Sequence, residues 1–400
     1  MQQQNESNRG FSPFQFQPIE QTLQTFQWFS MMRANQPVYH DEQSHLWHVF
    51  RYEDVTKVVT DYSHFSSESI PGFSENSFLN GTVVAKDPPD HRKLRNLVNQ
   101  AFTPRAVNHL SGRVTEIAQE LIDGIKPAGT MDVISDIAFP FPAKVIAELL
   151  GVPDKDWDIF RRWASGGEGV GSEVSTEDNT AQGQQSMEEN MYDFFSRLLA
   201  ERRESPREDL ISSLSVAEID GERLSERELV SFCILLLAAG QETTKNLIAN
   251  AMYLFTEYPE VAERLRQEPA LMPAAIEEIL RFLPPVWFTI RRATEDVQIG
   301  GQTIPANSIV MAWNSSANRD AAQFPDPDTF NIQRDPNRHL TFGHGIHFCI
   351  GAPLARLEGK VILPMLLEQL KDIKRVPDVP INVRAGIVYV IQSLPVTFSH

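Results

Sequence analysis

One cysteine stands in a segment suited to presenting a sulfur ligand. The stretch FGHGIHFCIG, residues 342–351, places Cys349 directly before a strongly helical run. A thiolate is a good soft ligand, and backbone N–H groups or a helix N-terminus stabilise its charge. Pro353 falls in the expected first turn of the following helix, where its missing N–H does no harm. Three glycines allow the backbone to turn closely around the sulfur, namely Gly343, Gly345 and Gly351. We therefore expect this segment to present one sulfur atom to a bound group.

Three interpretations of Cys349 are open from its residue type. It could be a buried structural cysteine in a glycine-rich turn. A zinc site would need further ligands, and the other cysteine of the sequence, Cys233, lies in the distant apolar run FCILLLAAG. Axial ligation of haem iron by a lone thiolate fits the segment better.

A second segment, AGQETT at residues 239–244, interrupts a long predicted helix. The helix is expected within residues 224–259, with Ser225 and Glu228 as a capping box and Pro259 at its end. Helix propensity alone would not place a glycine and two threonines in its middle. A threonine hydroxyl that bonds back to the i−4 carbonyl opens a helix locally and makes room for a small ligand. An ordinary glycine-containing kink is the alternative.

Several cationic side chains could hold anionic groups. His91 and Arg95 are four residues apart in DPPDHRKLRNLV and share one face of a predicted helix. Arg291 and Arg292 in FTIRRATEDV lie on opposite faces of a predicted strand, and His347 lies two residues before the cysteine. Each of them alone is also typical of a solvated surface.

Together these motifs resemble those of cytochromes P450. The spacing F-x-x-G-x-x-x-C-x-G over residues 342–351 resembles the haem-ligand loop of that family. AGQETT resembles the family helix that crosses the distal haem face, and the whole chain is similar to P450 family 109 from bacilli. The resemblance implies a mainly α fold with a small β-rich region, a triangular helical prism that encloses haem b.

The resemblance also assigns roles to individual residues. Cys349 would be the axial thiolate ligand, and Glu242 and Thr243 would form the proton relay that serves dioxygen. The haem propionates would be held by His91, Arg95, Arg291 and His347. Glu278 and Arg281 in EEILR, a surface ion pair by default, would be the family's buried pair, with Arg338 as the third member of a structural trio.

The same resemblance outlines an apolar substrate pocket, although any of its residues could equally be core. It would be lined by Ile70, Phe73, Phe78, Leu79, Val84, Leu235, Ala239, Val286, Trp287, Phe288 and Val388. These side chains suggest an apolar substrate of medium to large size. No cluster of cations in these segments would fix a carboxylate, which favours neutral ligands.

Composition limits the remaining possibilities. The chain has 400 residues and a net charge of −17, which argues against a nucleic-acid binder. Two cysteines, the absence of a signal peptide and the absence of a membrane anchor predict a cytoplasmic protein, expected as a monomer. We expect a polar tail at residues 1–12, a single domain over residues 13–400, and a solvated loop or mobile lid at residues 165–186.

The elements that position these residues follow from hydrophobic periodicity. PVYH and LWHVF predict a hairpin, and YEDVTKVVTDY predicts a short helix. Residues 104–284 are mainly helical in pattern, residues 286–310 are β-like, and the C-terminal GIVYVIQSLPVTF alternates like a strand.

The expected function is a monooxygenase that inserts one atom of dioxygen into C–H bonds of fatty acids, terpenoids or steroid-like molecules. Electrons would come from a separate ferredoxin or flavodoxin and its NAD(P)H-dependent reductase. The partner would dock on a basic patch drawn from Arg92, Lys93, Arg105 and Arg356, unless these are scattered solvated cations. The alternatives are a hydrogen-peroxide-driven peroxygenase, a non-catalytic haem protein that binds ligands, and a purely structural helical protein.

Overall fold

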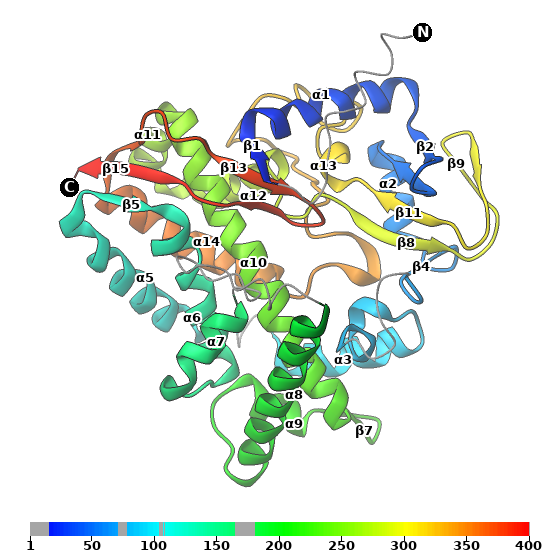
Figure 1. Ribbon diagram of the computed structural model, residues 1–400, viewed down its shortest axis with the longest axis horizontal. Helices are drawn as coiled ribbons and strands as arrows, with labels where there is room; N and C mark the ends of the chain where they lie inside the picture. Colours follow the sequence, from blue (N-terminus) through cyan, green and yellow to red (C-terminus); the bar gives the residue numbers. More distant parts are fainter. Residues whose placement is uncertain (1–15, 71–77, 104–106, 108, 165–180, 400) are drawn as a thin grey trace.

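The computed structural model describes residues 16–70, 78–103, 107, 109–164 and 181–399. The predicted tail at residues 1–12 lies outside these ranges, as do Phe73, Arg105 and residues 165–180 of the expected loop or lid. In the described part, helices form the bulk and small sheets lie at the periphery (Figure 1). The predicted class, mainly α with a small β-rich region, is confirmed.

The longest described helix, α10 (Glu226–Glu257), runs through the centre of the molecule (Figure 1). Its 32 residues span about 48 Å at 1.5 Å per residue. The predicted capping box is present, because the Ser225 hydroxyl accepts a hydrogen bond from the Glu228 N–H and the Glu228 carboxylate accepts one from the Ser225 N–H. Most side chains from Leu229 to Phe255 are buried, so packing stabilises the helix along its length.

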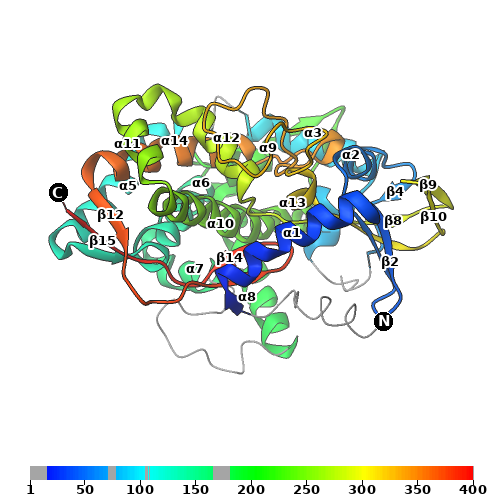
Figure 2. The ribbon, with the colours of Figure 1, turned by 90° about the horizontal axis from the view of Figure 1, so that it is seen from above.

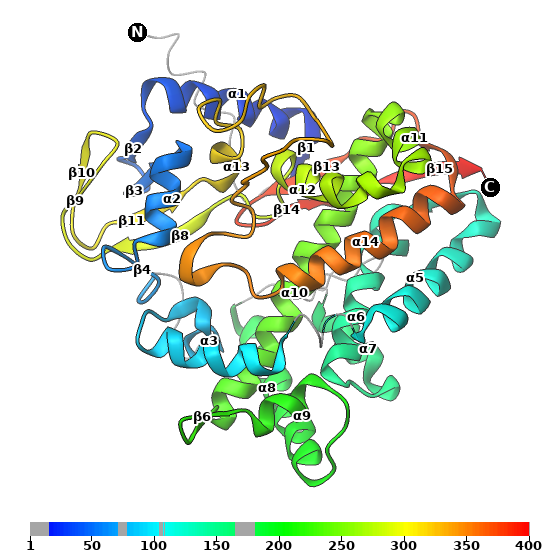
Figure 3. The same ribbon diagram turned by 180° about the vertical axis from the view of Figure 1, so that it is seen from behind.

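Helix α14 (Ala352–Gln369) follows the cysteine segment and crosses α10, as Figure 3 shows. Pro353 lies in its first turn, as predicted. The helix also packs against α5 (Ser111–Ile125), α11 (Pro259–Gln267) and α12 (Met272–Phe282). The cysteine is therefore positioned by a helix that is anchored on several sides.

The remaining helices surround this central pair. They are α1 (Ile19–Asn35), α2 (Tyr52–Thr60), α3 (Asp90–Ala101), α6 (Pro140–Leu150), α7 (Trp157–Ala164), α8 (Ala181–Glu204), α9 (Leu210–Val216) and α13 (Asn314–Ala317). Short 3₁₀ turns cover Phe78–Gly81, Val83–Ala85, Lys126–Ala128, Asp154–Asp156, Pro269–Leu271 and Gly345–His347, and a π-helical turn covers Ile134–Ala138.

The principal sheet has five strands in the order β2-β3-β11-β8-β4. Its strands are β2 (Val38–Asp41), β3 (Leu46–Val49), β11 (Ile309–Ala312), β8 (Thr289–Ala293) and β4 (Phe65–Ser66). Antiparallel β2 and β3 form the predicted hairpin, with Val38 opposite Val49, and β11 pairs in parallel with β3. Strand β8 places Arg291 beside the central helices.

Smaller sheets complete the fold. One has the order β1-β13-β14, with β1 (Phe16–Pro18), β13 (Asn382–Ala385) and β14 (Tyr389–Ile391). Another has the order β12-β15-β5, with β12 (Lys371–Arg375), β15 (Pro395–Ser399) and β5 (Thr130–Asp132). Two hairpins pair β9 (Val297–Ile299) with β10 (Gln302–Ile304) and β6 (Glu218–Ile219) with β7 (Glu222–Arg223).

Figure 2 shows the layout along the long axis: β2, β8, β9 and β10 gather at one end and β12 and β15 at the other, with helices between them. One large hydrophobic cluster contains side chains from α1 through β15. A second cluster lies under the principal sheet and includes Val49, Phe65 and Val310. Within the described residues, no helix combines the length and the apolar character needed to span a bilayer.

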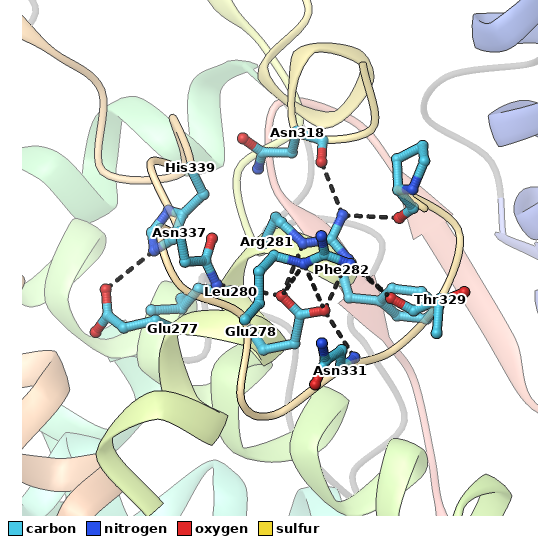
Figure 4. Close-up of polar contacts among 12 residues, drawn as sticks. Glu277, Glu278, Leu280, Arg281, Phe282, Asn318, Thr329, Asn331, Asn337 and His339 are labelled. Atoms are coloured by element: carbon cyan, nitrogen blue, oxygen red, sulfur yellow. Dashed lines mark hydrogen bonds and ion pairs between the residues drawn. The ribbon is translucent and has the colours of Figure 1, made fainter. Parts of the chain in front are cut away.

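A buried ion network fixes the end of α12 (Figure 4). Glu278 and Arg281 are both 0% exposed, and the guanidinium of Arg281 donates to both carboxylate oxygens of Glu278 at 2.7 and 2.8 Å. The third member is Arg334, whose Nε lies 3.3 and 3.2 Å from the same oxygens. Our expectation of Arg338 was wrong, because residues 325–329 wrap their carbonyls around the Arg334 guanidinium. Arg338 is instead seen in a backbone contact, where its carbonyl accepts a hydrogen bond from the Tyr52 hydroxyl.

Candidate active site

A cavity of about 360 Å³ separates the middle of α10 from the cysteine segment and the start of α14. The α10 wall is formed by Leu235, Leu236, Ala239, Gly240, Thr243, Thr244 and Leu247. The opposite wall is formed by Phe342, Gly343, His344, His347, Cys349, Ile350, Gly351, Leu354, Ala355 and Glu358. The two segments for which the sequence predicted chemistry therefore line one shared cavity.

The backbone of the cysteine segment is held in a tight turn. Gly343 and Gly345 have φ values of 69° and 70°, which L side chains rarely adopt. A Cβ on Gly345 would also lie 3.3 Å from Cα of Thr60 on α2. The N–H of Cys349 donates to the carbonyl of Phe342 at 2.8 Å and closes the turn. Gly345 is thus required by both conformation and space and Gly343 by conformation, whereas Gly351 has a φ of −79° and room for a Cβ, so the expectation that it too was needed for the turn was wrong.

Two opposing effects act on the pKa of the Cys349 thiol. The residue is open to the cavity, yet protein surrounds it closely enough that burial raises the pKa of the thiol. Backbone N–H groups of Gly351 and Ala352 and the guanidinium of Arg95 act in the opposite direction and favour the thiolate. A cation bound at the sulfur would complete this stabilisation, which fits a metal-bearing cofactor.

On the opposite wall, α10 carries the expected back-bonded threonine. The Thr243 hydroxyl donates to the carbonyl of Ala239 at 2.7 Å. A Cβ on Gly240 would lie 2.8 Å from Cδ1 of Ile146, so the glycine allows α6 to approach closely. The neighbouring Glu242 is not among the residues that line the cavity; its side chain is 36% exposed and lies 3.8 Å from Nζ of Lys245. A hydroxyl at the cavity is therefore followed by a carboxylate that reaches solvent.

One edge of the cavity is cationic. Arg95 from α3, Arg291 from β8 and His347 all line it. Burial lowers the pKa of Arg291 to about 10 against the pull of Asp87. The pKa of His347 falls to about 3 through burial and through Arg291, His91 and Arg95. Burial thus lowers the pKa of both Arg291 and His347, and the neighbouring cations lower that of His347 further, so an anionic ligand would be favourable here.

His91, whose ring lies beside that of His347, also indicates a site for an anionic ligand. Its ring lies 4.4 Å from that of His347, and its buried Nε2 has no hydrogen-bonding partner among the described residues. His347 itself is held by the hydroxyl of Ser67 at 3.0 Å and lies 3.9 Å from a carboxylate oxygen of Asp87. A sulfur ligand, apolar walls and a cationic edge together fit haem with its two propionates.

The structure brings together some of the predicted substrate-pocket residues and separates others. Val84, Leu235, Ala239 and Val286 line the cavity, and Val388 forms a β-bridge with Val286. Trp287 and Phe288 are in the core instead, stacked on Tyr389 and packed against Trp313. Ile70 is buried, and Phe78 and Leu79 pack against the core without lining the cavity.

Other lining residues were not anticipated from the sequence. Asn314 donates through Nδ2 to the hydroxyl of Thr289 at 3.0 Å, and both residues line the cavity. Thr244 and Glu358 also line it. Glu358 had a detectable signal, since it is an acid between Leu354 and Ile362 on an apolar helix face.

Two members of the expected basic patch have acidic partners. Lys93 lies 2.9 Å from a carboxylate oxygen of Glu222. Arg356 donates to both oxygens of Glu277 at 2.7 and 2.8 Å. Arg92 is exposed, and Phe348, beside the ligand cysteine, is 38% exposed. The expected basic patch is thus partly neutralised by ion pairs, and the residue next to Cys349 adds an exposed apolar side chain.

This site defines a haem-thiolate protein, and comparison with known proteins assigns the family. The family profile described as Cytochrome P450 matches residues 175–388. The chain is 43% identical over 373 residues to putative cytochrome P450 YjiB of Bacillus subtilis, covering 93% of each chain. It is 41% identical over 350 residues to cytochrome P450 109 of Bacillus spizizenii, covering 87% of this chain and 84% of the relative. The chain belongs to the cytochrome P450 family.

Solved structures agree with this assignment. CYP109E1 of Bacillus megaterium aligns with a TM-score of 0.89 at 36% identity, covering 94% of this chain and 99% of the other. CYP109Q5 of Chondromyces apiculatus aligns with a TM-score of 0.86 at 40% identity, covering 94% and 95%. The protein is a cytochrome P450 monooxygenase most like family 109, with haem b and a cysteine thiolate as axial ligand.

Proposed function

We propose that this enzyme hydroxylates or epoxidises neutral, apolar molecules of the steroid or terpenoid class. The observation that carries the proposal is the α10 wall, where Leu235, Leu236 and Ala239 adjoin Thr243 across from Cys349. A substrate held against this wall would be shielded from water, would contact apolar side chains and would lie close to the Thr243 hydroxyl. The CYP109E1 structures with corticosterone and testosterone support the steroid class.

The arginines of the cavity do not argue for acidic substrates. Arg95 and Arg291 lie with His347 at the edge that suits the two propionates of haem. A substrate carboxylate would compete with these anions for the same cations. Neutral molecules therefore fit the remaining apolar surface best.

Cys349 would hold the haem iron, and His91, Arg95, Arg291 and His347 would hold its propionates. When bound, the haem supplies the redox chemistry that activates dioxygen. Thr243 would hold a water molecule and a proton at its Oγ1, on the cavity side of α10. Glu242 would exchange protons between that position and solvent, because its carboxylate is partly exposed.

Electrons would arrive from a separate ferredoxin or flavodoxin and its NAD(P)H-dependent reductase. We propose that the partner docks over the exposed Phe348, which adjoins the ligand cysteine in sequence, and that the exposed Arg92 contributes to the attraction. The ion pairs of Lys93 and Arg356 leave these two with less charge for docking than their sequence suggests. Replacing Arg92 with glutamate should slow reduction in a salt-dependent way. Unchanged reduction rates would count against this docking surface.

We further propose that the enzyme acts as a cytoplasmic monomer. Both cysteines are free thiols in the structure, which suits a reducing compartment. Sedimentation of the purified protein at several concentrations tests the monomer directly. A concentration-dependent shift to a larger species would overturn it.

The test of function is turnover of a steroid and terpenoid panel with labelled dioxygen, NAD(P)H, redox partners and catalase. We expect label in the product, one oxygen atom per molecule, with the second atom reduced to water. Products formed only from hydrogen peroxide and abolished by catalase would establish the peroxygenase alternative. The back-bonded Thr243 beside Glu242 favours the dioxygen reaction, since peroxide use needs no proton relay of this kind.

A further inference from the structure

The cavity contains a polar pair that none of the roles described above uses. Asn314, the first residue of α13, and Thr289, the first residue of β8, both line the cavity. Asn314 is 1% exposed, and its Nδ2 donates a hydrogen bond to the Thr289 hydroxyl at 3.0 Å. The pair brings a buried amide and a hydroxyl group to the wall of the same cavity that would hold haem and substrate.

Backbone hydrogen bonds fix the position of Asn314. In the principal sheet, Ala312 of β11 pairs with Thr289 of β8, so the chain leaves the sheet beside the threonine two residues before it reaches Asn314. The next residue, Ser315, donates to the carbonyl of Trp287 through both its N–H and its hydroxyl, each at 3.0 Å. The pair is therefore presented by a rigid backbone, which reduces the conformational entropy lost when a ligand binds.

The hydrogen-bonding capacity of this pair is only partly used. Oδ1 of Asn314 is buried and has no hydrogen-bonding partner among the described residues. The Thr289 hydroxyl accepts from Asn314, which leaves its own O–H to donate. Buried polar groups in folded proteins are nearly always paired, because an unpaired group has lost its hydrogen bonds to water. A ligand in the cavity is therefore expected to supply a donor to the amide oxygen.

This pattern of donor and acceptor restricts the chemistry of the ligand. Haem propionates and ketones only accept hydrogen bonds, so neither can pair with Oδ1 of Asn314. The propionates would also find their cations at the edge formed by Arg95, Arg291 and His347. An alcohol has both functions, since its O–H can donate to Asn314 and its oxygen can accept from Thr289. Among neutral apolar ligands, the pattern therefore favours an alcohol.

We propose that Asn314 and Thr289 form a recognition site for a hydroxyl group, so that the preferred substrates are apolar alcohols of the steroid or terpenoid class. The substrate O–H donates to Oδ1 of Asn314, and the Thr289 O–H donates to the substrate oxygen. This anchor orients the carbon skeleton and limits which C–H bonds are oxidised. The inference rests on the proposed monooxygenase function and names the substrate class within it.

The direct test is a titration of the ferric holoenzyme, followed by the spin-state change of its haem. The probes are two matched series: androstan-3β-ol, androstan-3-one and androstane, and menthol, menthone and p-menthane. We expect the alcohol of at least one series to bind about three- to tenfold more tightly than its hydrocarbon, as for one net hydrogen bond. Equal affinities throughout, as expected if the pair holds only water, would overturn the proposal. A ketone that binds more tightly than its alcohol would contradict the assigned donor and acceptor.

Two variants locate the preference for alcohols. Asn314→Leu and Thr289→Val each remove hydrogen-bonding groups with little change of size, and both should reduce the affinity ratio of alcohol to hydrocarbon toward one. Asn250→Leu is the matched control, because Asn250 is also a buried amide with an unpartnered Oδ1 but lies outside the cavity lining. A ratio that survives in both cavity variants, or that falls equally in Asn250→Leu, would exclude the pair as the anchor.

Product analysis separates this inference from the proposed function. The parent enzyme should oxidise the preferred alcohol mainly at one carbon, and Asn314→Leu should spread oxidation over several positions. Equal kcat/KM for alcohol, ketone and hydrocarbon would remove the inference and leave the monooxygenase function intact. If the parent enzyme oxidised no probe, the proposed function would fail, while the spin-state titrations would still decide whether the cavity prefers alcohols.

Discussion

Two glutamates, both fully buried, show how differently this fold treats an acid. Glu278 is surrounded by donors: the guanidinium groups of Arg281 and Arg334, the N–H of Asn331 at 2.9 Å and the amide of Asn337 at 3.2 Å. Among the residues that the structure describes, Glu358 has no donor for either oxygen. The first acid is part of the scaffold, and the second faces the cavity. A buried acid with unused hydrogen-bonding capacity therefore indicates a place for a ligand more strongly than burial alone.

The same substitution in the two positions gives the largest expected contrast. Glu278→Gln leaves two buried guanidinium groups without their carboxylate, so it should lower the free energy of unfolding by about 3–5 kcal/mol. Glu358→Gln replaces a carboxyl group that has no hydrogen-bonding partner among the described residues by a group of similar size and should cost less than about 1 kcal/mol. Urea denaturation of both variants checks this. Similar losses of unfolding free energy in the two variants would show that the two acids do not differ in their contribution to stability.

A third acid, Glu277, lies between these extremes, since it is paired but 28% exposed. Burial alone raises the pKa of Glu277, but hydrogen bonds from Arg356 and His339 outweigh it and hold the pKa at about 2. The contribution to stability is fully present above the unfolded pKa of about 4.3 and is lost as pH falls through about 2. Glu277→Gln should therefore be less stable than the parent by roughly 1–3 kcal/mol at pH 6.

Denaturation midpoints across acid pH give the measurement for Glu277. The difference between parent and variant should shrink as pH falls from 4 toward 2. A difference that stays constant over this range would show that Glu277 is not an ionised partner of Arg356.

The cationic edge extends the comparison to the ligand side, because Arg95, Arg291 and His347 all line the cavity. Arg291→Gln removes a buried cation from the cavity and should weaken haem binding about ten- to a hundredfold, the range for one charged hydrogen bond. Arg292→Gln is the matched control on the next residue, where the guanidinium contacts Asn307 at 3.1 Å and does not line the cavity. The measurement is a haem titration of the two apoproteins. Equal haem affinities of the two variants would exclude Arg291 as a propionate ligand.

The smallest effect concerns the hydroxyl of Thr243, which lies on the α10 wall of the cavity. Thr243→Ala should lower product per NADPH about tenfold and release hydrogen peroxide, because the reacting oxygen loses a proton-holding neighbour. Thr256→Ala removes a comparable back-bond, to Tyr253 at 2.7 Å, outside the cavity lining of the same helix. Coupled turnover in both variants would exclude Thr243 from the relay.

Local rules account for what could be predicted from the sequence. The capping box of α10, the back-bond of Thr243 and the glycine turn before Cys349 depend on residues within a few positions of one another. The partner of Glu278 could not be found this way, because Arg334 and Arg338 differ only in how a long loop folds back. Trp287 and Val286 are both apolar, and only tertiary packing decides which of them meets the cavity.

Glu358 shows a second limit of prediction from the sequence. Its spacing within an apolar helix face was visible, but the sequence could not reveal whether a donor from another helix would satisfy it. The structure answers this through its unpartnered oxygens. An acid on an apolar face is thus a useful signal only when the neighbouring elements are also known.

The central claim, that the Cys349 thiolate holds the haem iron, is tested most directly by adding carbon monoxide to the dithionite-reduced protein. We expect a strongly red-shifted Soret band in the parent enzyme and its loss in Cys349→Ala. A Soret band without that shift in intact, freshly prepared parent protein, or an unchanged spectrum in the variant, would contradict the account.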